Sequence, residues 1–130
     1  MRCVNCKKTG TYRPWKGPVE LMGIDVEAKG MRCAACGELL FDADEVRRQE
    51  RALADVLVAR GIRSGREFKL VRKVAGLRAA ELADMLDVRP ETVSRWERGE
   101  VAIPRSAAFV LGELFERPRE ARRRLAALAR

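Results

Sequence analysis

The sequence predicts a mainly helical protein with a small β-rich domain at its N-terminus. Three observations support this fold class. All four cysteines lie in the first 36 residues, residues 1–41 are rich in glycine and only weakly periodic, and apolar residues recur at helical spacing from residue 46 onward. We therefore assign residues 1–45 to a cysteine domain, residues 46–65 to a connecting helix and hinge, and residues 66–130 to a domain of five helices.

Two short strands are expected in the N-terminal domain. They cover residues 11–15 and 19–26, and residues 16–18 (Lys-Gly-Pro) would form the turn between them. The large apolar side chains of this domain are expected to pack around the cysteines; they are Tyr12, Trp15, Met22 and Phe41.

Two cysteine pairs form the most specific motif of this domain. Cys3 and Cys6 make one CxxC pair, Cys33 and Cys36 make the other, and 26 residues separate the pairs. A two-residue gap lets both sulfur atoms of a pair face one ion, and the N–H groups of the tight turn stabilise the thiolate charge. Gly37 suits the turn after the second pair. Because the usual separation is about 15–20 residues, the longer one implies an inserted hairpin.

Two such pairs supply the tetrahedral sulfur site that zinc prefers. A redox dithiol, a disulfide pair and an iron centre are the competing interpretations. Zinc is favoured because a domain of this size cannot bury enough apolar surface without a metal or covalent link. We expect one structural Zn²⁺ per chain, because four thiolates leave no open position for a substrate. Its ligands are expected to be Cys3, Cys6, Cys33 and Cys36.

In the remainder of the chain, glycine and proline residues separate segments whose apolar residues recur at helical spacing. The connecting helix should begin after Asp42 or Asp44, either of which suits an N-cap, and should run to Gly61. Five further helices are expected, each ended by glycine or opened by proline. They cover about residues 66–75, 79–86, 90–99, 105–115 and 119–130.

Charge is distributed unevenly along the chain. Its 130 residues carry a formal net charge of +8 and include no histidine. Residues 1–45 contain seven basic and seven acidic side chains, whereas residues 46–130 contain 20 basic and 12 acidic ones. A polyanionic partner is therefore expected to meet the C-terminal part. Because the chain has no histidine, it cannot use histidine as a general base. We therefore expect that the protein is not an enzyme.

Neither a membrane-spanning segment nor a signal peptide is expected. No apolar run approaches the roughly 18 residues that a spanning helix needs, and the first six residues lack an apolar core. We expect a soluble cytoplasmic protein with no membrane partner. In that compartment paired cysteines more often bind metal than form disulfides.

The segment from Leu70 to Gly99 resembles the helix-turn-helix of Cro- and Xre-type repressors. Six apolar residues can face one core, namely Leu82, Ala83, Leu86, Val88, Val93 and Trp96. In such domains the second helix of the motif enters the major groove of double-stranded DNA. The resemblance places four residues on its groove-facing side, which are Arg89, Glu91, Thr92 and Arg95.

Arg95 is expected to read a base, because a guanidinium group can donate two hydrogen bonds to guanine. Glu91 could accept from cytosine, or could instead hold Arg95 as an i,i+4 partner. Many members of the family carry a DNA-contacting glutamine where this chain has Ala79, so Arg78 is expected to contact a phosphate instead. The operator sequence should differ accordingly.

The same resemblance implies two further roles. Arg105 matches an arginine that contacts the DNA backbone and minor groove. Arg72 and Glu97 match an ion pair that ties the first helix of the domain to the recognition helix, and we expect this pair to be structural.

The two halves together resemble the MqsA family of antitoxins, which combine an N-terminal zinc domain with a C-terminal Xre-type domain. The resemblance rests on the CxxC pairs and on residues 94–99 (Ser-Arg-Trp-Glu-Arg-Gly). Where that family reads bases with an asparagine and an arginine, this chain has Glu91 and Arg95. The resemblance implies a type II antitoxin that neutralises a protein toxin through its zinc domain. It also implies a homodimer that represses its own operon at a palindromic operator. The alternative is an Xre-type regulator whose zinc domain binds another protein and which has no toxin partner.

Overall fold

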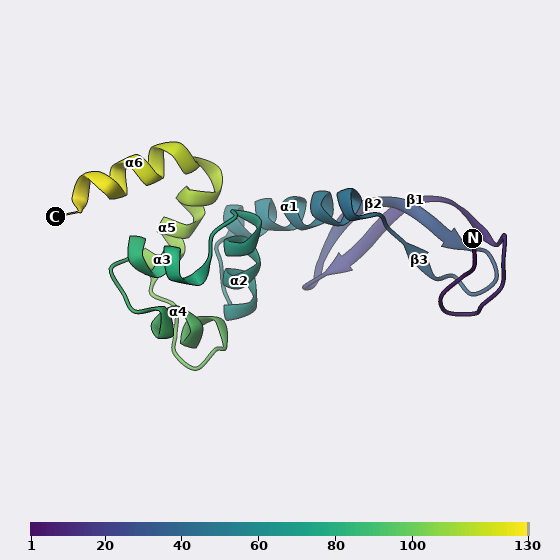
Figure 1. Cartoon of the computed structure of the whole chain (residues 1–130), viewed down its shortest axis with the longest axis horizontal. Helices are drawn as coiled ribbons and strands as arrows, with labels where there is room; N and C mark the ends of the chain where they lie inside the picture. The colour runs from purple at the N-terminus through teal and green to yellow at the C-terminus, as the bar shows by residue number, and fades with distance from the viewer. Residues whose placement is uncertain (130) are drawn as a thin grey trace. The chain divides into compact units, whose positions relative to one another are not determined.

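The computed structural model describes residues 1–129, which form two compact units, residues 1–53 and residues 54–129. A three-stranded antiparallel sheet is followed by six helices (Figure 1). The expected fold class is therefore confirmed: the chain is mainly helical, and its strands are confined to the N-terminal part.

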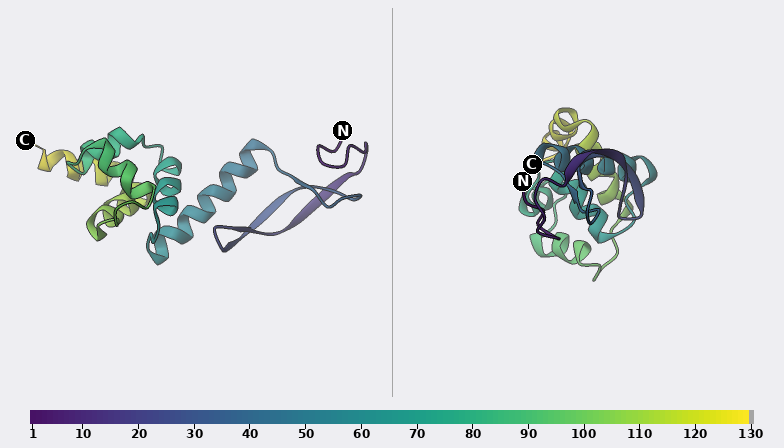
Figure 2. Two further views of the ribbon diagram at one scale, coloured as in Figure 1. Left: turned by 90° about the horizontal axis from the view of Figure 1, so that it is seen from below. Right: turned by 90° about the vertical axis from the view of Figure 1, so that its right-hand side faces the viewer.

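The sheet of the first unit is built on one long hairpin. Strands β1 (Tyr12–Leu21) and β2 (Ile24–Cys33) pair along their whole length (Figure 2). The short β3 (Leu39–Leu40) lies on the other side of β2. The turn consists of Met22 and Gly23, whose φ angles of 50° and 76° are those of a two-residue hairpin turn.

The predicted turn at residues 16–18 is wrong, because β1 runs straight through it. β1 is an edge strand with one neighbour, so one side of its backbone has no partner strand. Pro14 and Pro18 stand four residues apart and present the same backbone side, which an edge strand tolerates. The prolines that suggested a break therefore mark the edge of the sheet.

Helix α1 (Ala43–Arg60) packs its beginning against the hairpin. Asp42 caps it, since its Oδ1 accepts a hydrogen bond from the Glu45 N–H at 2.8 Å. The buried Glu45 carboxylate accepts from the Lys29 N–H at 3.1 Å and from the Arg48 and Gln49 side chains. These bonds lower the pKa of the Glu45 carboxyl to about 2, with Arg48 as the main cause.

Five helices follow α1 in the second unit, as predicted, with ends within about two residues of those expected. They are α2 (Gly65–Val74), α3 (Ala79–Met85), α4 (Pro90–Glu97), α5 (Arg105–Glu116) and α6 (Pro118–Leu128). Their core is fully apolar at its centre, where Phe68 meets Trp96 edge to face at 5.9 Å between ring centroids. The other large buried side chains include Leu57, Val71, Leu82, Val93, Leu111 and Leu114.

Gly65 sets how closely α2 approaches α4. A Cβ atom at this position would collide with the carbonyl oxygens of Trp96 and Glu97 at the end of α4. Because glycine has no Cβ, the start of α2 can pack directly on the backbone of α4. The end of α4 is thereby fixed in the unit.

Candidate metal centre and nucleic-acid interface

The four cysteines converge on one point of the first unit. Their sulfur atoms all lie within 4.8 Å of one another, and the Cys3–Cys36 and Cys6–Cys33 sulfur pairs are each 3.7 Å apart. A tetrahedral zinc ion with Zn–S bonds of about 2.3 Å needs sulfur atoms about 3.8 Å apart. The sulfurs are too far apart for a disulfide, whose S–S bond is about 2.05 Å. The cluster therefore has the dimensions of a metal site.

Two equivalent turns present the sulfur atoms. In the first, the Cys3 carbonyl accepts from the Lys7 N–H at 3.0 Å, and in the second the Cys33 carbonyl accepts from the Gly37 N–H at 2.8 Å. Lys7 and Gly37 both have positive φ angles, 67° and 81°. Sequence reasoning found Gly37 and missed Lys7, because a lysine gives no signal for this conformation. The CxxC spacing of the first pair was the only clue to that turn.

The Thr11 side chain next to the cluster favours charged sulfur at Cys33. A hydrogen bond between the Thr11 hydroxyl and Cys33 Sγ, 3.1 Å long, is the main cause that lowers the pKa of the Cys33 thiol to about 6. The backbone N–H groups of Cys36 and Ala35 act in the same direction, while burial opposes them. A lowered thiol pKa favours the thiolate, which is the form that ligates metal. Thr11 was not identified from the sequence.

Tyr12 is the aromatic residue that packs with the cysteines. It shares a small buried cluster with Cys3 and Cys33. Its buried hydroxyl has no conventional hydrogen-bond partner in residues 1–129, and the adjacent Cys3 sulfur is the first cause that raises the pKa of the phenol. The phenol thus stays protonated at neutral pH beside the Cys3 sulfur.

The expectation that all the large apolar residues surround the cysteines is wrong for three of them. Trp15 and Phe41 pack on each other, with ring centroids 6.4 Å apart, and Met22 lies in the hairpin turn. Trp15 and Phe41 instead line an open groove, together with Pro14, Met31 and Leu40. The register explains the difference, because Trp15 and Tyr12 lie on opposite faces of β1.

The donor set fits a metal ion such as zinc. Four cysteine sulfurs within 4.8 Å of one another can supply a closed coordination shell without water or substrate. Cys3 and Cys33 are fully buried, whereas Cys36 is exposed. Bound metal would therefore hold the N-terminal turn and the end of β2 together, which is a structural task.

In the second unit a buried ion pair joins α2 to α4. Arg72 on α2 donates from Nε and Nη2 to the Glu97 carboxylate on α4, at 2.7 and 3.0 Å, and from Nη1 to the Leu77 carbonyl at 2.9 Å. The two side chains are only 9% and 8% exposed. All three contacts are charge-assisted, and together they tie α2 to the end of α4 and to the loop before α3.

Helix α4 buries one face and exposes the other. Val93 and Trp96 are buried, while Glu91 and Arg95 are exposed and Thr92 is partly exposed. The Arg95 guanidinium makes no hydrogen bond or ion pair with any residue in the described part of the chain, so Glu91 does not hold it. Arg95 is thus an exposed arginine on a helix whose opposite face is anchored.

The other predicted contact residues are also on the surface. Arg89 directly precedes α4 and is exposed, and Arg105 is exposed at the start of α5. Arg78 precedes α3 and forms an ion pair with Glu81 at 2.9 Å, although 81% of its side chain stays exposed. A phosphate contact by Arg78 would compete with this pair.

Comparison with known families gives one match. The family model described as "Helix-turn-helix" matches residues 68–120, which span α2 to α5 and the start of α6. No curated protein matches the chain. The helix-turn-helix domain supports a DNA-binding transcription regulator, and the four-cysteine cluster places a candidate metal centre in its other unit. No helix in residues 1–129 is long and apolar enough to span a membrane.

Proposed function

We propose that the protein is a sequence-specific transcriptional repressor that inserts α4 into the major groove of double-stranded DNA. The observation that carries this proposal is the exposed Arg95, whose side chain has no hydrogen-bond or ion-pair partner in residues 1–129. It stands on a helix fixed from behind by Val93, Trp96 and the buried Arg72–Glu97 pair. A rigid support holds a side chain in its reading position at little further cost in entropy. This role is that of a binding protein, not of an enzyme.

The neighbouring residues fit the same orientation. Arg89, Glu91 and Thr92 would meet base edges or adjacent phosphates from the first turn of α4. Arg78 and Arg105 would contact the DNA backbone on either side. Phosphate contacts of this kind set the position and orientation of the protein, whereas base contacts set sequence preference.

Replacing Arg95 tests the reading role. Arg95→Ala should weaken operator binding by about 1–3 kcal/mol and relax the preference at one base pair. Arg95→Lys is the matched control, because it keeps the charge and loses the two-pronged guanine contact. It should retain more affinity than Arg95→Ala but show the same loss of preference. Titration of operator variants by fluorescence anisotropy measures both, and unchanged affinity and selectivity in Arg95→Ala would contradict the proposal.

We further propose that the metal is zinc, one ion per chain, and that the first unit binds a protein partner. The open groove beside Trp15 and Phe41 supports this role. Its lining is largely apolar, and its charged residues are three acidic ones (Asp42, Asp44 and Glu45) and two basic ones (Lys29 and Arg48), with the buried Glu45 paired to Arg48. An exposed apolar groove of this kind suits a protein partner. In a type II antitoxin that autoregulates its operon, this partner would be a protein toxin.

An Xre-type regulator whose zinc domain binds a different protein is the second candidate. The groove fits both candidates, so the identity of the partner distinguishes them. If the product of an adjacent gene arrests growth, co-expression with this protein should restore it, and a groove variant such as Phe41→Glu should restore it less. Absence of rescue by the unmodified protein would favour the regulator without a toxin.

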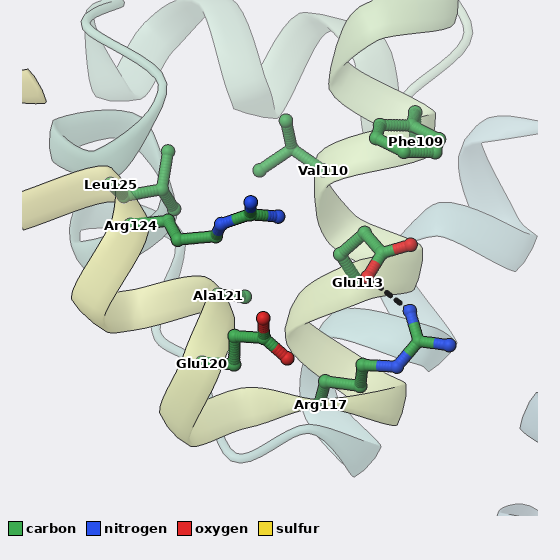
Figure 3. Close-up of a pocket in the computed structure, with 8 residues that line it drawn as sticks. All are labelled: Phe109, Val110, Glu113, Arg117, Glu120, Ala121, Arg124 and Leu125. Carbon is green, nitrogen blue, oxygen red and sulfur yellow. Dashed lines mark hydrogen bonds and ion pairs between the residues drawn. The ribbon is translucent and has the colours of Figure 1, made fainter.

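We also propose a homodimer that forms through α5 and α6. Phe109 on α5 is 68% exposed and lies beside a groove between these helices (Figure 3). The groove is lined by Val110, Ala121 and Leu125, with two acidic and two basic side chains around it. Glu113 pairs with Arg117 at 3.0 Å, whereas Glu120 and Arg124 have no ion-pair partner in residues 1–129. A second copy, turned about a two-fold axis, could supply both missing partners and could bury Phe109.

A further inference from the structure

The first unit has no net charge over residues 1–45, but its charges are separated in space. Five of its seven basic residues belong to the cysteine turns and the adjoining strand ends, together with one acidic residue, Glu38. These five are Arg2, Lys7, Lys8, Arg13 and Arg32. The other six acidic residues lie along the rest of the hairpin and at the start of α1. The cysteine end is therefore basic, which a sum over the sequence conceals.

The five basic side chains, which we call the knuckle cations, point to solvent. All five residues are exposed, and none forms an ion pair with a carboxylate in the described part of the chain. Arg2 Nε donates to the Lys7 carbonyl at 3.2 Å, and the Arg32 guanidinium lies beside Gly37 of the second turn. Arg13 and Arg32 stand directly opposite each other on β1 and β2.

The metal centre does not account for this charge. A zinc ion with four thiolates has a net charge of about −2, and Glu38 adds one more negative charge. The five positive charges of the knuckle cations exceed the negative charge of the zinc–thiolate centre and Glu38 together. The knuckle cations are also exposed, whereas Cys3 and Cys33 are buried. Positive charge therefore remains available at the surface when the centre is filled.

We propose that the knuckle cations form a second nucleic-acid site, which binds the phosphate backbone of double-stranded DNA without sequence preference. Lysine and arginine side chains are the usual phosphate ligands. Single-stranded nucleic acid is normally bound by aromatic side chains on which bases stack. The aromatic residue among these turns, Tyr12, is buried and cannot stack. The surface thus suits a duplex backbone, and it goes beyond the operator contacts proposed for α4.

The test compares two double variants of the full-length, zinc-loaded protein. Lys8→Glu with Arg32→Glu reverses two knuckle cations whose side chains make no hydrogen bond in residues 1–129. Lys16→Glu with Lys29→Glu is the matched control, because it makes the same change in net charge at an exposed cross-strand pair nearer the middle of the hairpin. Binding to a non-specific duplex is measured by anisotropy over a range of salt concentrations.

The knuckle variant should bind the non-specific duplex at least tenfold more weakly. The slope of log K against log salt concentration should become less steep by about 0.9 for each phosphate that the variant no longer neutralises. The control should change much less. Equal effects in both variants, no effect in the knuckle variant, or tighter binding of single strands than of duplex would each overturn the proposal. Lys8→Gln with Arg32→Gln, checked for metal content, replaces the first variant if it fails to fold.

The same measurement separates this site from the reading helix. In an Arg95→Ala background operator binding should weaken and the preference at one base pair should relax, while the effect of the knuckle variant on the non-specific duplex should persist. If Arg95→Ala changes nothing and the knuckle variant still weakens binding, the proposed function of α4 fails and this site stands. If instead the knuckle variant changes nothing and Arg95→Ala weakens operator binding, the proposal for the knuckle cations fails and the proposed function of α4 stands.

Discussion

Removal of the metal by a chelator should unfold the cysteine turns and the hairpin of the first unit and leave the helices of the second unit folded. The buried cluster at the cysteine end contains Cys3, Tyr12 and Cys33, with Cys6, Met31 and Leu40 against it. So small a core cannot offset the entropy of ordering the chain. Structural zinc contributes about 10–16 kcal/mol of apparent binding free energy, which is then folding free energy.

Two tryptophans allow each unit to be followed separately. Trp15 lies in β1 and Trp96 in α4, so Trp96→Phe leaves a reporter in the first unit and Trp15→Phe leaves one in the second. Chelation should change the emission of Trp15 and leave that of Trp96 unaltered. Metal analysis of the native protein should return about one zinc ion per chain with four unreactive thiols. A folded, metal-free hairpin with slow amide exchange, or thiols that alkylate freely in the native protein, would contradict the structural role.

The helices could be predicted because their signals are local. Gly76 and Pro90, for instance, act on their own backbone, and the structure ends or starts helices within a few residues of both. The gap between the cysteine pairs predicted a hairpin, but the position of its turn could not be predicted in the same way. Proline has no N–H to donate, so Pro18 interrupts a strand only where a neighbouring strand would need a hydrogen bond from that position. Whether such a neighbour exists is a property of the sheet and not of the local sequence. The true turn, Met22-Gly23, lacks the asparagine or aspartate that usually marks such a turn.

The same distinction between local signals and long-range pairing applies to the candidate sites. The CxxC spacing predicted a four-cysteine cluster because two residues between cysteines fix the local geometry, and the cluster is present. Thr11 and Tyr12 come to the sulfur atoms only through the pairing of β1 with β2, so no local pattern marks them. For Glu91 and Arg95, helical spacing permitted an ion pair, but the structure leaves both side chains unpaired. An i,i+4 spacing places two side chains within reach of each other on a helix. Whether they form an ion pair depends on the free energy that each charged group loses when it gives up its water.

Phe109→Asp is expected to convert a dimer into monomers and to weaken binding to a palindromic operator by about 10²–10⁴-fold, the usual gain from joining two binding modules. A carboxylate at this position would have to be desolvated in the proposed interface, next to Glu113 and Glu120 of the groove. Because the Phe109 side chain is mostly exposed in the single chain, its replacement should leave folding of the unit intact. The helical circular dichroism should therefore be unchanged.

The control is Val56→Asp, which puts the same charge on another exposed apolar position of the second unit, outside the α5–α6 groove. Sedimentation velocity should give a dimer for this variant and a monomer for Phe109→Asp. A monomeric unmodified protein, or a dimer that survives Phe109→Asp, would remove α5 and α6 from the interface. A half-site duplex adds a further distinction, because one copy of α4 reads one half-site. Phe109→Asp should bind the half-site as well as the unmodified protein does, whereas Arg95→Ala should lose affinity for the half-site and the palindrome alike.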